Sequence, residues 1–373
     1  MKYRFTGFVC LVGLLLVAPT LASREVEPLK IGAQAPDFDL PGVDGRNWSL
    51  SDFKDAKLLM VIFTCNHCPT AQAYEQRIID LHREYKPKGV ALVAISPNDD
   101  LAVRLDELGY SDLGDSLEDM KVRAEDRGFE FPYLYDGDTQ ETSAEFGVLA
   151  TPHVYIFDEQ RTLRYVGRFD DQEVREPTSH DARRALDELL AGQDVSVPQT
   201  RVFGCSTKWS DKRQSAIDAL AKWNREGAEL QSISPEKLKR RLTDKSEKYR
   251  LVNVWATWCA PCIAEMDDLV TIHRMYRNRP FELITVSADF LEMHEAAQKV
   301  LAEKNCSASN YILDTDSRDA LFDAVDSEWQ GAIPYTVLIS PDGEILHRVS
   351  GQFDPLKLRR VIVDHIGRTY ASK

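Results

Sequence analysis

Beyond residue 22 the sequence has no hydrophobic run of membrane-spanning length, and nowhere does it have a cluster of basic residues. A transmembrane helix needs about 20 consecutive apolar residues, so we expect the chain after residue 22 to be soluble. Asp and Glu number 60 against 46 Lys and Arg, a formal net charge of -14. This balance argues against nucleic acid and anionic membranes as partners. Low-complexity segments are also missing.

The one long apolar stretch, residues 8–18, lies near the N-terminus behind Lys2 and Arg4. Small residues follow it up to Ala22, an order typical of a signal peptide. We predict cleavage near Ala22 and a periplasmic or secreted protein. An uncleaved anchor is the alternative, although the stretch is short for a span. A lipoprotein would need its cysteine just after the stretch, whereas Cys10 lies inside it.

Only seven cysteines occur, and four of them form two short pairs, Cys65 with Cys68 and Cys259 with Cys262. Each pair follows an apolar run and opens a helical pattern. Free N–H groups and the helix dipole at such a place favour a thiolate. The alternatives are a structural disulfide or half a zinc site. A four-residue loop stabilises little, and the two further ligands of a zinc site are missing, so the pairs predict two redox sites.

The segments after each pair repeat in the same order, which indicates a duplicated fold. The repeated features are a buried strand (90–96 and 281–287), a second strand (133–136 and 311–314), a proline that opens a third (Pro152 and Pro334) and a Gly-x-Phe-Asp ending (167–170 and 351–354). Strands near 58–64 and 250–256 precede the cysteine helices. The fold class predicted is α/β, with two domains that each have a central mixed sheet flanked by helices.

The expected domain borders follow from composition. Residues 192–200 are rich in Gly, Pro and polar residues, residues 208–229 are charged and helix-compatible, and Ser234-Pro235 is a capped helix start. We therefore predict four parts: a signal peptide (1–22), a first domain (23–206), an interdomain helical linker (207–231) and a second domain (232–373).

Two segments resemble known families. Residues 252–262, Val-Asn-Val-Trp-Ala-Thr-Trp-Cys-Ala-Pro-Cys, resemble the active-site segment of TlpA- and ResA-like exported thioredoxins of the cytochrome c maturation type, over roughly residues 232–373. Residues 31–38, Cys65-Asn66-His67-Cys68-Pro69 and the ending Gly204-Cys205-Ser206 resemble the alkyl hydroperoxide reductase and thiol-specific antioxidant branch of the same superfamily. The resemblance implies tandem thioredoxin-like domains and a thiol–disulfide oxidoreductase that needs no cofactor or metal.

The resemblance also assigns a role to the two strand-opening prolines. Proline cannot donate to a sheet ladder, so its place in a central strand needs a reason. In the related families a cis-proline packs against the cysteine pair, and the residue before it offers backbone groups to an incoming peptide. Carried over, this makes Thr151-Pro152 and Ile333-Pro334 parts of the two sites.

For the second site we expect a Cys259–Cys262 disulfide in the oxidised state, with Cys259 as the exposed nucleophile and Cys262 as the resolving thiol. Trp258 either shields the pair or is a packing aromatic. Many thioredoxins have a buried aspartate where this chain has Asn253. Glu265, one turn after Cys262, is a candidate proton acceptor, and its alternative role is that of a helix acid beside the N-terminal dipole.

For the first site we expect a Cys65–Cys68 disulfide and a thiolate on Cys65 that His67 stabilises. A stabilised reduced form makes a pair more oxidising, so the first pair is predicted to be a stronger oxidant than the second. Cys205 is either a third redox sulfur of this site or a small buried hydrophobe. Cys306 has no motif around it, and the two could also bond each other.

Two other activities are alternatives for the first site. Peroxiredoxins resemble one another in a Pro-x-x-x-Thr-x-x-Cys run, whereas Ile62 and Cys65 stand three residues before the two cysteines here. A copper metallochaperone could use Cys65 and Cys68 with His67 or His153, although the spacing of its cysteines is usually one residue longer.

The function predicted is thiol–disulfide exchange on exported proteins, with a possible relay of electrons between the domains. The expected partners are protein thiols or disulfides in the exported compartment and an upstream redox protein. In a non-catalytic alternative, one domain serves as a binding platform.

Overall fold

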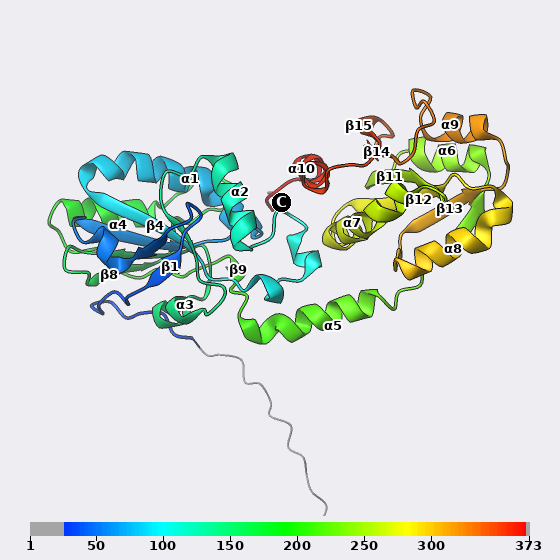
Figure 1. The fold of residues 1–373 in the computed structure, drawn as a ribbon. Coiled ribbons are helices and arrows are strands. Elements are labelled where there is room, and N and C mark those ends of the chain that lie inside the picture. Colours follow the sequence, from blue (N-terminus) through cyan, green and yellow to red (C-terminus); the bar gives the residue numbers. More distant parts are fainter. Residues whose placement is uncertain (1–25, 371–373) are drawn as a thin grey trace, which may run out of the picture.

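The computed structural model describes residues 26–370 of the chain. The predicted signal peptide and its cleavage near Ala22 lie outside these residues. Within them, no helix combines the length and the apolar character that crossing a membrane requires. Two bodies of strands and helices lie side by side in Figure 1, with α5 and α10 between them.

The first half is built on a five-stranded mixed sheet of order β5-β4-β3-β7-β8. The central strand β3 pairs parallel with β4 and antiparallel with β7. The strands are β3 (Leu58–Phe63), β4 (Val90–Ser96), β5 (Tyr133–Tyr135), β7 (His153–Phe157) and β8 (Leu163–Gly167). Two small antiparallel pairs accompany the sheet: β1 (Asp39–Pro41) with β2 (Asn47–Ser49), and β6 (Ala150–Thr151) with β9 (Cys205–Ser206).

Strand β3 is apolar at every position, and its side chains alternate between the two faces of the sheet. Both faces are therefore buried against helices. Met60 and Ile62 lie in one cluster with side chains of α1, α2 and α4, and Val61 and Phe63 lie in another with Phe146 of α3. The helices are α1 (Pro69–Tyr85), α2 (Leu117–Arg127), α3 (Glu141–Phe146) and α4 (Asp181–Leu190).

The second half has a six-stranded sheet of order β10-β13-β12-β11-β14-β15. Each of its helices contributes a buried leucine to one core, namely Leu238, Leu269, Leu301, Leu321 and Leu358. The strands are β10 (Leu230–Ile233), β11 (Tyr249–Trp255), β12 (Phe281–Ser287), β13 (Ser309–Leu313), β14 (Tyr335–Ile339) and β15 (Ile345–Ser350). The helices are α6 (Pro235–Thr243), α7 (Ala260–Tyr276), α8 (His294–Glu303), α9 (Arg318–Val325) and α10 (Pro355–Ile366). The predicted α/β class with two mixed sheets is thus confirmed.

The segment between the two sheets contacts the first half at its start and the second half at its end. Lys208 and Arg213 bind the first half, where Lys208 O accepts from Asp99 N (3.0 Å) and Arg213 Nε donates to Asp99 Oδ2 (2.5 Å). Helix α5 (Arg213–Trp223) follows, and Leu230 already belongs to the edge strand of the second sheet. Both ends of the predicted linker, residues 207–231, thus contact a neighbouring sheet or its loops.

A loop of the first half, residues 104–115, joins the two halves. Tyr276 Oη of α7 donates to Ser111 O (3.0 Å), and Arg279 Nη1 donates to Gly109 O (2.8 Å). The Asp112 carboxylate, which is buried, pairs with Arg360 of α10 (3.2 Å) and with Arg368 beyond it (2.5 Å). These contacts place α10 and the segment after it against the first half (Figure 1).

Candidate active site

Each cysteine motif meets a helix of 17 residues, α1 or α7, but the helices begin at different points of the motifs. The last cysteine of the first motif, Cys68, caps α1, and Ala71 N donates to its sulfur (3.5 Å). The first cysteine of the second motif, Cys259, caps α7, and Cys262 N donates to its sulfur (3.3 Å). The expectation that Cys65 opens the first helix is therefore wrong.

Strand register supports the equivalence of Cys68 with Cys259. On β3, Phe63 lies opposite His153, the residue after the first of the two prolines, and on β11 Val254 lies opposite Tyr335, the residue after the second. Five residues then lead from Phe63 to Cys68 and from Val254 to Cys259. Counted this way, the position of Cys65 corresponds to Ala256, and that of Ala71 to Cys262.

Pro69 already indicates in the sequence that the first helix begins later in its cysteine motif than the second helix does. Proline is favoured at the first helical position and keeps the residue before it out of helical conformation. Cys68-Pro69 therefore marks Cys68 as the cap, whereas in the second motif the proline, Pro261, stands one position further into the helix.

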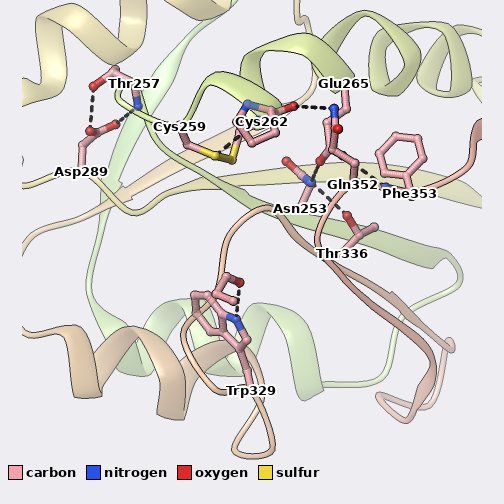
Figure 2. Close-up of a disulfide and its surroundings, with 12 residues drawn as sticks. Asn253, Thr257, Cys259, Cys262, Glu265, Asp289, Trp329, Thr336, Gln352 and Phe353 are labelled. Atoms are coloured by element: carbon pink, nitrogen blue, oxygen red, sulfur yellow. Dashed lines mark hydrogen bonds between the residues drawn. A yellow bond between two sulfur atoms is a disulfide. The ribbon is translucent and has the colours of Figure 1, made fainter.

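In the second site, Cys259 and Cys262 form a disulfide (Figure 2). Cys259 is 5% exposed and Cys262 is fully buried, so Cys259 is the more accessible sulfur. Trp258 is 64% exposed, which excludes the role of a packing aromatic. The loop before the pair is held by Asp289, which accepts hydrogen bonds from Thr257 N (2.9 Å) and Thr257 Oγ1 (2.8 Å).

To one side of the disulfide lies a buried polar group centred on Glu265 (Figure 2). Asn253 Nδ2 donates to Glu265 Oε1 (2.9 Å) and to Thr336 Oγ1 (3.0 Å), and Phe353 N donates to Glu265 Oε2 (3.4 Å). Burial raises the pKa of Glu265 to about 7. An acid that merely complements the helix dipole would be exposed and would have a lowered pKa, so the role of helix acid does not fit Glu265.

In the first site, Asp115 organises the loop before α1. Its Oδ1 accepts from Asn66 N (2.9 Å) and His67 N (3.1 Å), and its Oδ2 lies 2.5 Å from His67 Nδ1. Burial disfavours the imidazolium, but the Asp115 carboxylate outweighs it and raises the pKa of His67. Asp115 stands 48 residues after His67, and no local pattern links the two in the sequence.

The sulfurs of the first pair are free thiols in this structure, unlike the disulfide expected for the oxidised state. Cys65 Sγ lies 3.2 Å from Thr151 Oγ1, and Cys68 Sγ lies 3.4 Å from Thr151 O. Burial raises the pKa of Cys65 well above the ordinary thiol value. This direction is opposite to the one expected for Cys65.

The pKa of Cys68 shifts in the opposite direction to that of Cys65. Burial opposes its ionisation, but hydrogen bonds from the thiols of Cys205 and Cys65, together with the charge of His67, outweigh burial and hold the pKa of Cys68 well below the usual value. Cys205 is half-buried and packs against the Cys65–Cys68 cluster, so it is not a fully buried hydrophobe. Cys306 is buried elsewhere, where its thiol donates to Asn310 Oδ1 (3.5 Å).

Both expected prolines follow a cis peptide bond, Thr151-Pro152 and Ile333-Pro334. His153, the next residue, is directed away from the sulfurs by its hydrogen bonds. Its Nδ1 lies 3.1 Å from Tyr155 Oη and accepts from Leu149 N (3.5 Å), and burial lowers the pKa of His153 to about 3.

A metal-compatible group does exist among the described residues, formed by Cys65, His67 and Asp115, whose ligand atoms lie within 4.8 Å of one another. Its carboxylate oxygen is a hard ligand, whereas Cu(I) prefers soft sulfur ligands. Because this group contains only one cysteine, the described residues do not bring both Cys65 and Cys68 together with His67 or with His153 as the copper alternative requires.

A mixed sheet whose central strand leads to a cysteine-capped helix, with a cis-proline at the start of the neighbouring strand, defines a thioredoxin-like protein. This chain has that arrangement twice. It belongs to the AhpC/TSA family, whose profile matches residues 31–166 and 227–348.

The relatives match parts of the chain. A "Thiol-disulfide oxidoreductase ResA" of Oceanobacillus iheyensis is 30% identical over 110 residues, which are 30% of this chain and 53% of that protein. A "Thioredoxin-like protein YneN" of Bacillus subtilis is 26% identical over 43% of this chain and 86% of its own length. A solved structure of an uncharacterized conserved protein from Geobacillus kaustophilus is 37% identical over 51% of this chain and 98% of its own, with a TM-score of 0.45.

Proposed function

We propose that the chain is a thiol–disulfide oxidoreductase that acts on exported proteins through two cysteine sites, one in each predicted domain (23–206 and 232–373). One observation carries the proposal: the Cys259–Cys262 disulfide lies at the start of α7, the helix that also carries buried Glu265 one turn after Cys262. The ResA-named relatives, at low identity, support the same activity.

The chemistry at the second site follows from accessibility and from the buried acid. A substrate thiolate attacks Cys259, the S–S bond breaks, and the electron pair leaves with Cys262. Glu265, protonated below its pKa of about 7, supplies a proton toward the Cys262 thiolate. In the reverse reaction, ionised Glu265 takes that proton, Cys262 attacks the mixed disulfide, and Cys259 leaves as a thiolate.

Exposed apolar side chains near Cys259 suit a polypeptide substrate. Trp258 is largely exposed, and Phe290, Leu291 and Met293 follow Asp289, the residue that anchors the loop before the cysteines. Apolar side chains grouped beside a reactive sulfur provide a contact surface for an unfolded or extended chain.

Reduction of insulin disulfides by the full chain, with dithiothreitol as the electron source, tests the proposal. Cys259→Ser and Cys262→Ser should each abolish the contribution of the second site, a loss of about tenfold or more if this site is the principal one. Cys306→Ala removes a buried thiol outside both sites and is the control, with an expected rate within twofold of wild type. A wild-type chain that reduces insulin no faster than dithiothreitol alone would contradict the proposal.

A further inference from the structure

A short strand of the chain itself covers the backbone beside the first cis-proline. Strand β9 pairs antiparallel with β6, and Cys205 lies directly opposite Thr151. Residues opposite each other in an antiparallel pair project to the same face. Because Thr151 Oγ1 lies beside Cys65 Sγ, Cys205 faces the buried thiols, and it packs against the cluster that contains Cys65 and Cys68.

The close approach of β9 depends on Gly204. This residue has φ +138°, and a Cβ atom on it would lie 2.1 Å from Thr151 O, far inside van der Waals contact. A residue with a side chain could not keep this path, so the backbone before Cys205 is shaped for this position.

The second half differs at the corresponding place. Among residues 26–370, no strand pair includes Ile333, the residue before the second cis-proline. Backbone without a partner can pair with an extended peptide from another molecule. The two halves thus differ in access, since one has its own chain beside the cysteine-capped helix and the other leaves that place open.

We propose that Cys205 stands where a substrate cysteine would stand, and that Cys68 and Cys205 form an internal disulfide through which outside thiols exchange electrons with the first site. The inference rests on the proposed thiol–disulfide function and extends it with a resolving residue, Cys205. Small thiols and flexible cysteine segments are the substrate class that this arrangement admits, because β9 excludes an extended peptide from the edge of β6.

The proposed exchange takes place in two steps. An outside thiolate attacks Cys205 Sγ, the Cys68–Cys205 bond breaks, and the electron pair stays on Cys68 as a thiolate. A second outside thiol then attacks the mixed disulfide at the outside sulfur. Its proton passes to Cys205, which leaves as a thiol, and one outside disulfide is released. Reoxidation is the reverse exchange with the disulfide of another partner protein.

Burial and acidity agree with this order of events. Cys68 has no exposed surface and Cys65 has 3%, whereas Cys205 is half-buried, so an outside thiol reaches Cys205 first. Cys68, whose pKa is lowered, is the better leaving group. Tyr370 is a further neighbour of Cys205, and the Tyr370 ring packs on Tyr110 (5.0 Å).

The test is disulfide mapping of the wild-type full chain after oxidation with oxidised glutathione, followed by thiol blocking, digestion without reductant and mass spectrometry. A Cys68–Cys205 linked peptide is expected as the main product of the first site, and it should persist in Cys65→Ser. Brief treatment of the oxidised protein with reduced glutathione and an acid quench should place the mixed disulfide on Cys205. Buried Cys306 serves as the internal control and should stay unlinked in every sample.

A Cys65–Cys68 link with Cys205 left free, or glutathione on Cys68, would overturn the inference. Wild-type protein needs no substitution to fold, so either result is decisive. Insulin reduction measured on the same preparation separates the two proposals: an active protein without the Cys68–Cys205 link sinks only this inference, and an inactive one sinks the proposed function.

Discussion

The same residue type has different tasks at equivalent positions because its surroundings differ. Cys68 and Cys259 both cap a 17-residue helix. Cys259 has a disulfide partner one turn further along the helix, while Cys68 has Ala71 at that place and thiols from Cys65 and Cys205 instead. The acid–base groups differ as well, since a His67–Asp115 pair serves one site and Glu265 the other.

Glu265→Gln is expected to stabilise the oxidised protein at alkaline pH. The carboxyl has a pKa of 4.5 when exposed and about 7 in the fold, so the folded state binds its proton more tightly between these values. Wild-type stability therefore falls as the pH rises from about 4.5 to 7, by about 2–3 kcal/mol for this group. Glutamine carries no charge at any pH. Urea unfolding at pH 8 should therefore give a larger free energy of unfolding for Glu265→Gln than for wild type, and this difference should vanish near pH 4.5.

The matched control is Asp267→Asn on the same helix, whose carboxylate is mostly exposed and pairs with Lys304 (2.7 Å). An exposed pair contributes about 0–1 kcal/mol, so this variant should follow wild type at both pH values. A Glu265→Gln protein that is less stable than wild type at pH 8 would show that Glu265 is held as a hydrogen-bonded anion.

At the scale of elements, the sequence predicts what local patterns determine. Strands β3 and β11 and the Ser234 cap of α6 lie where hydrophobic runs and capping residues predict them. Local patterns do not show that α1 begins only after Cys68, because residues 64–67 form a loop that distant Asp115 stabilises. The position of Cys205 was left open for the same reason, since the β6–β9 pair joins residues far apart in the chain.

Gly204→Ala should displace β9 from β6. A Cβ at this position collides with Thr151 O, and the positive φ is unfavourable for alanine. We expect a loss of about 1–3 kcal/mol in the free energy of unfolding, together with faster hydrogen exchange in residues 203–208. Gly227→Ala is the control, because nothing lies within 4 Å of its Cβ position. Unchanged exchange in residues 203–208 of Gly204→Ala would contradict the close approach.

At the scale of the whole molecule, the loop 104–115 serves both halves. Asp115 at its end organises the cysteine loop of the first site, while Ser111 and Asp112 bind α7 and α10 of the second half. The carboxylate of Asp112 is buried among Arg123, Arg360 and Arg368. Burial opposes its ionisation, but Arg123 and Arg368 hold the pKa of Asp112 below the usual range. The two sites are thus connected through one short segment.

Asp112→Ala should loosen this junction. The change leaves three arginines without their shared partner, and loss of one member of a buried ion pair costs about 3–5 kcal/mol. Urea unfolding should shift accordingly, and small-angle scattering should report a larger radius of gyration. Asp126→Ala removes a partly exposed partner of Arg360 at the same junction and is expected to cost about 0–1 kcal/mol. If Asp112→Ala and Asp126→Ala had equal effects, the buried ion pairs of Asp112 would not be the main stabilising contacts between the two halves.

The contact of Tyr370 with Cys205 has a practical consequence for handling the protein. The side chain of Tyr370 is a neighbour of the half-buried Cys205 of the first site. An affinity tag or fluorescent fusion joined close to this tyrosine would disturb the surroundings of that sulfur. Redox measurements on the first site therefore call for a tag at another position, and comparison of tagged and cleaved protein would reveal how far the attachment slows glutathione exchange.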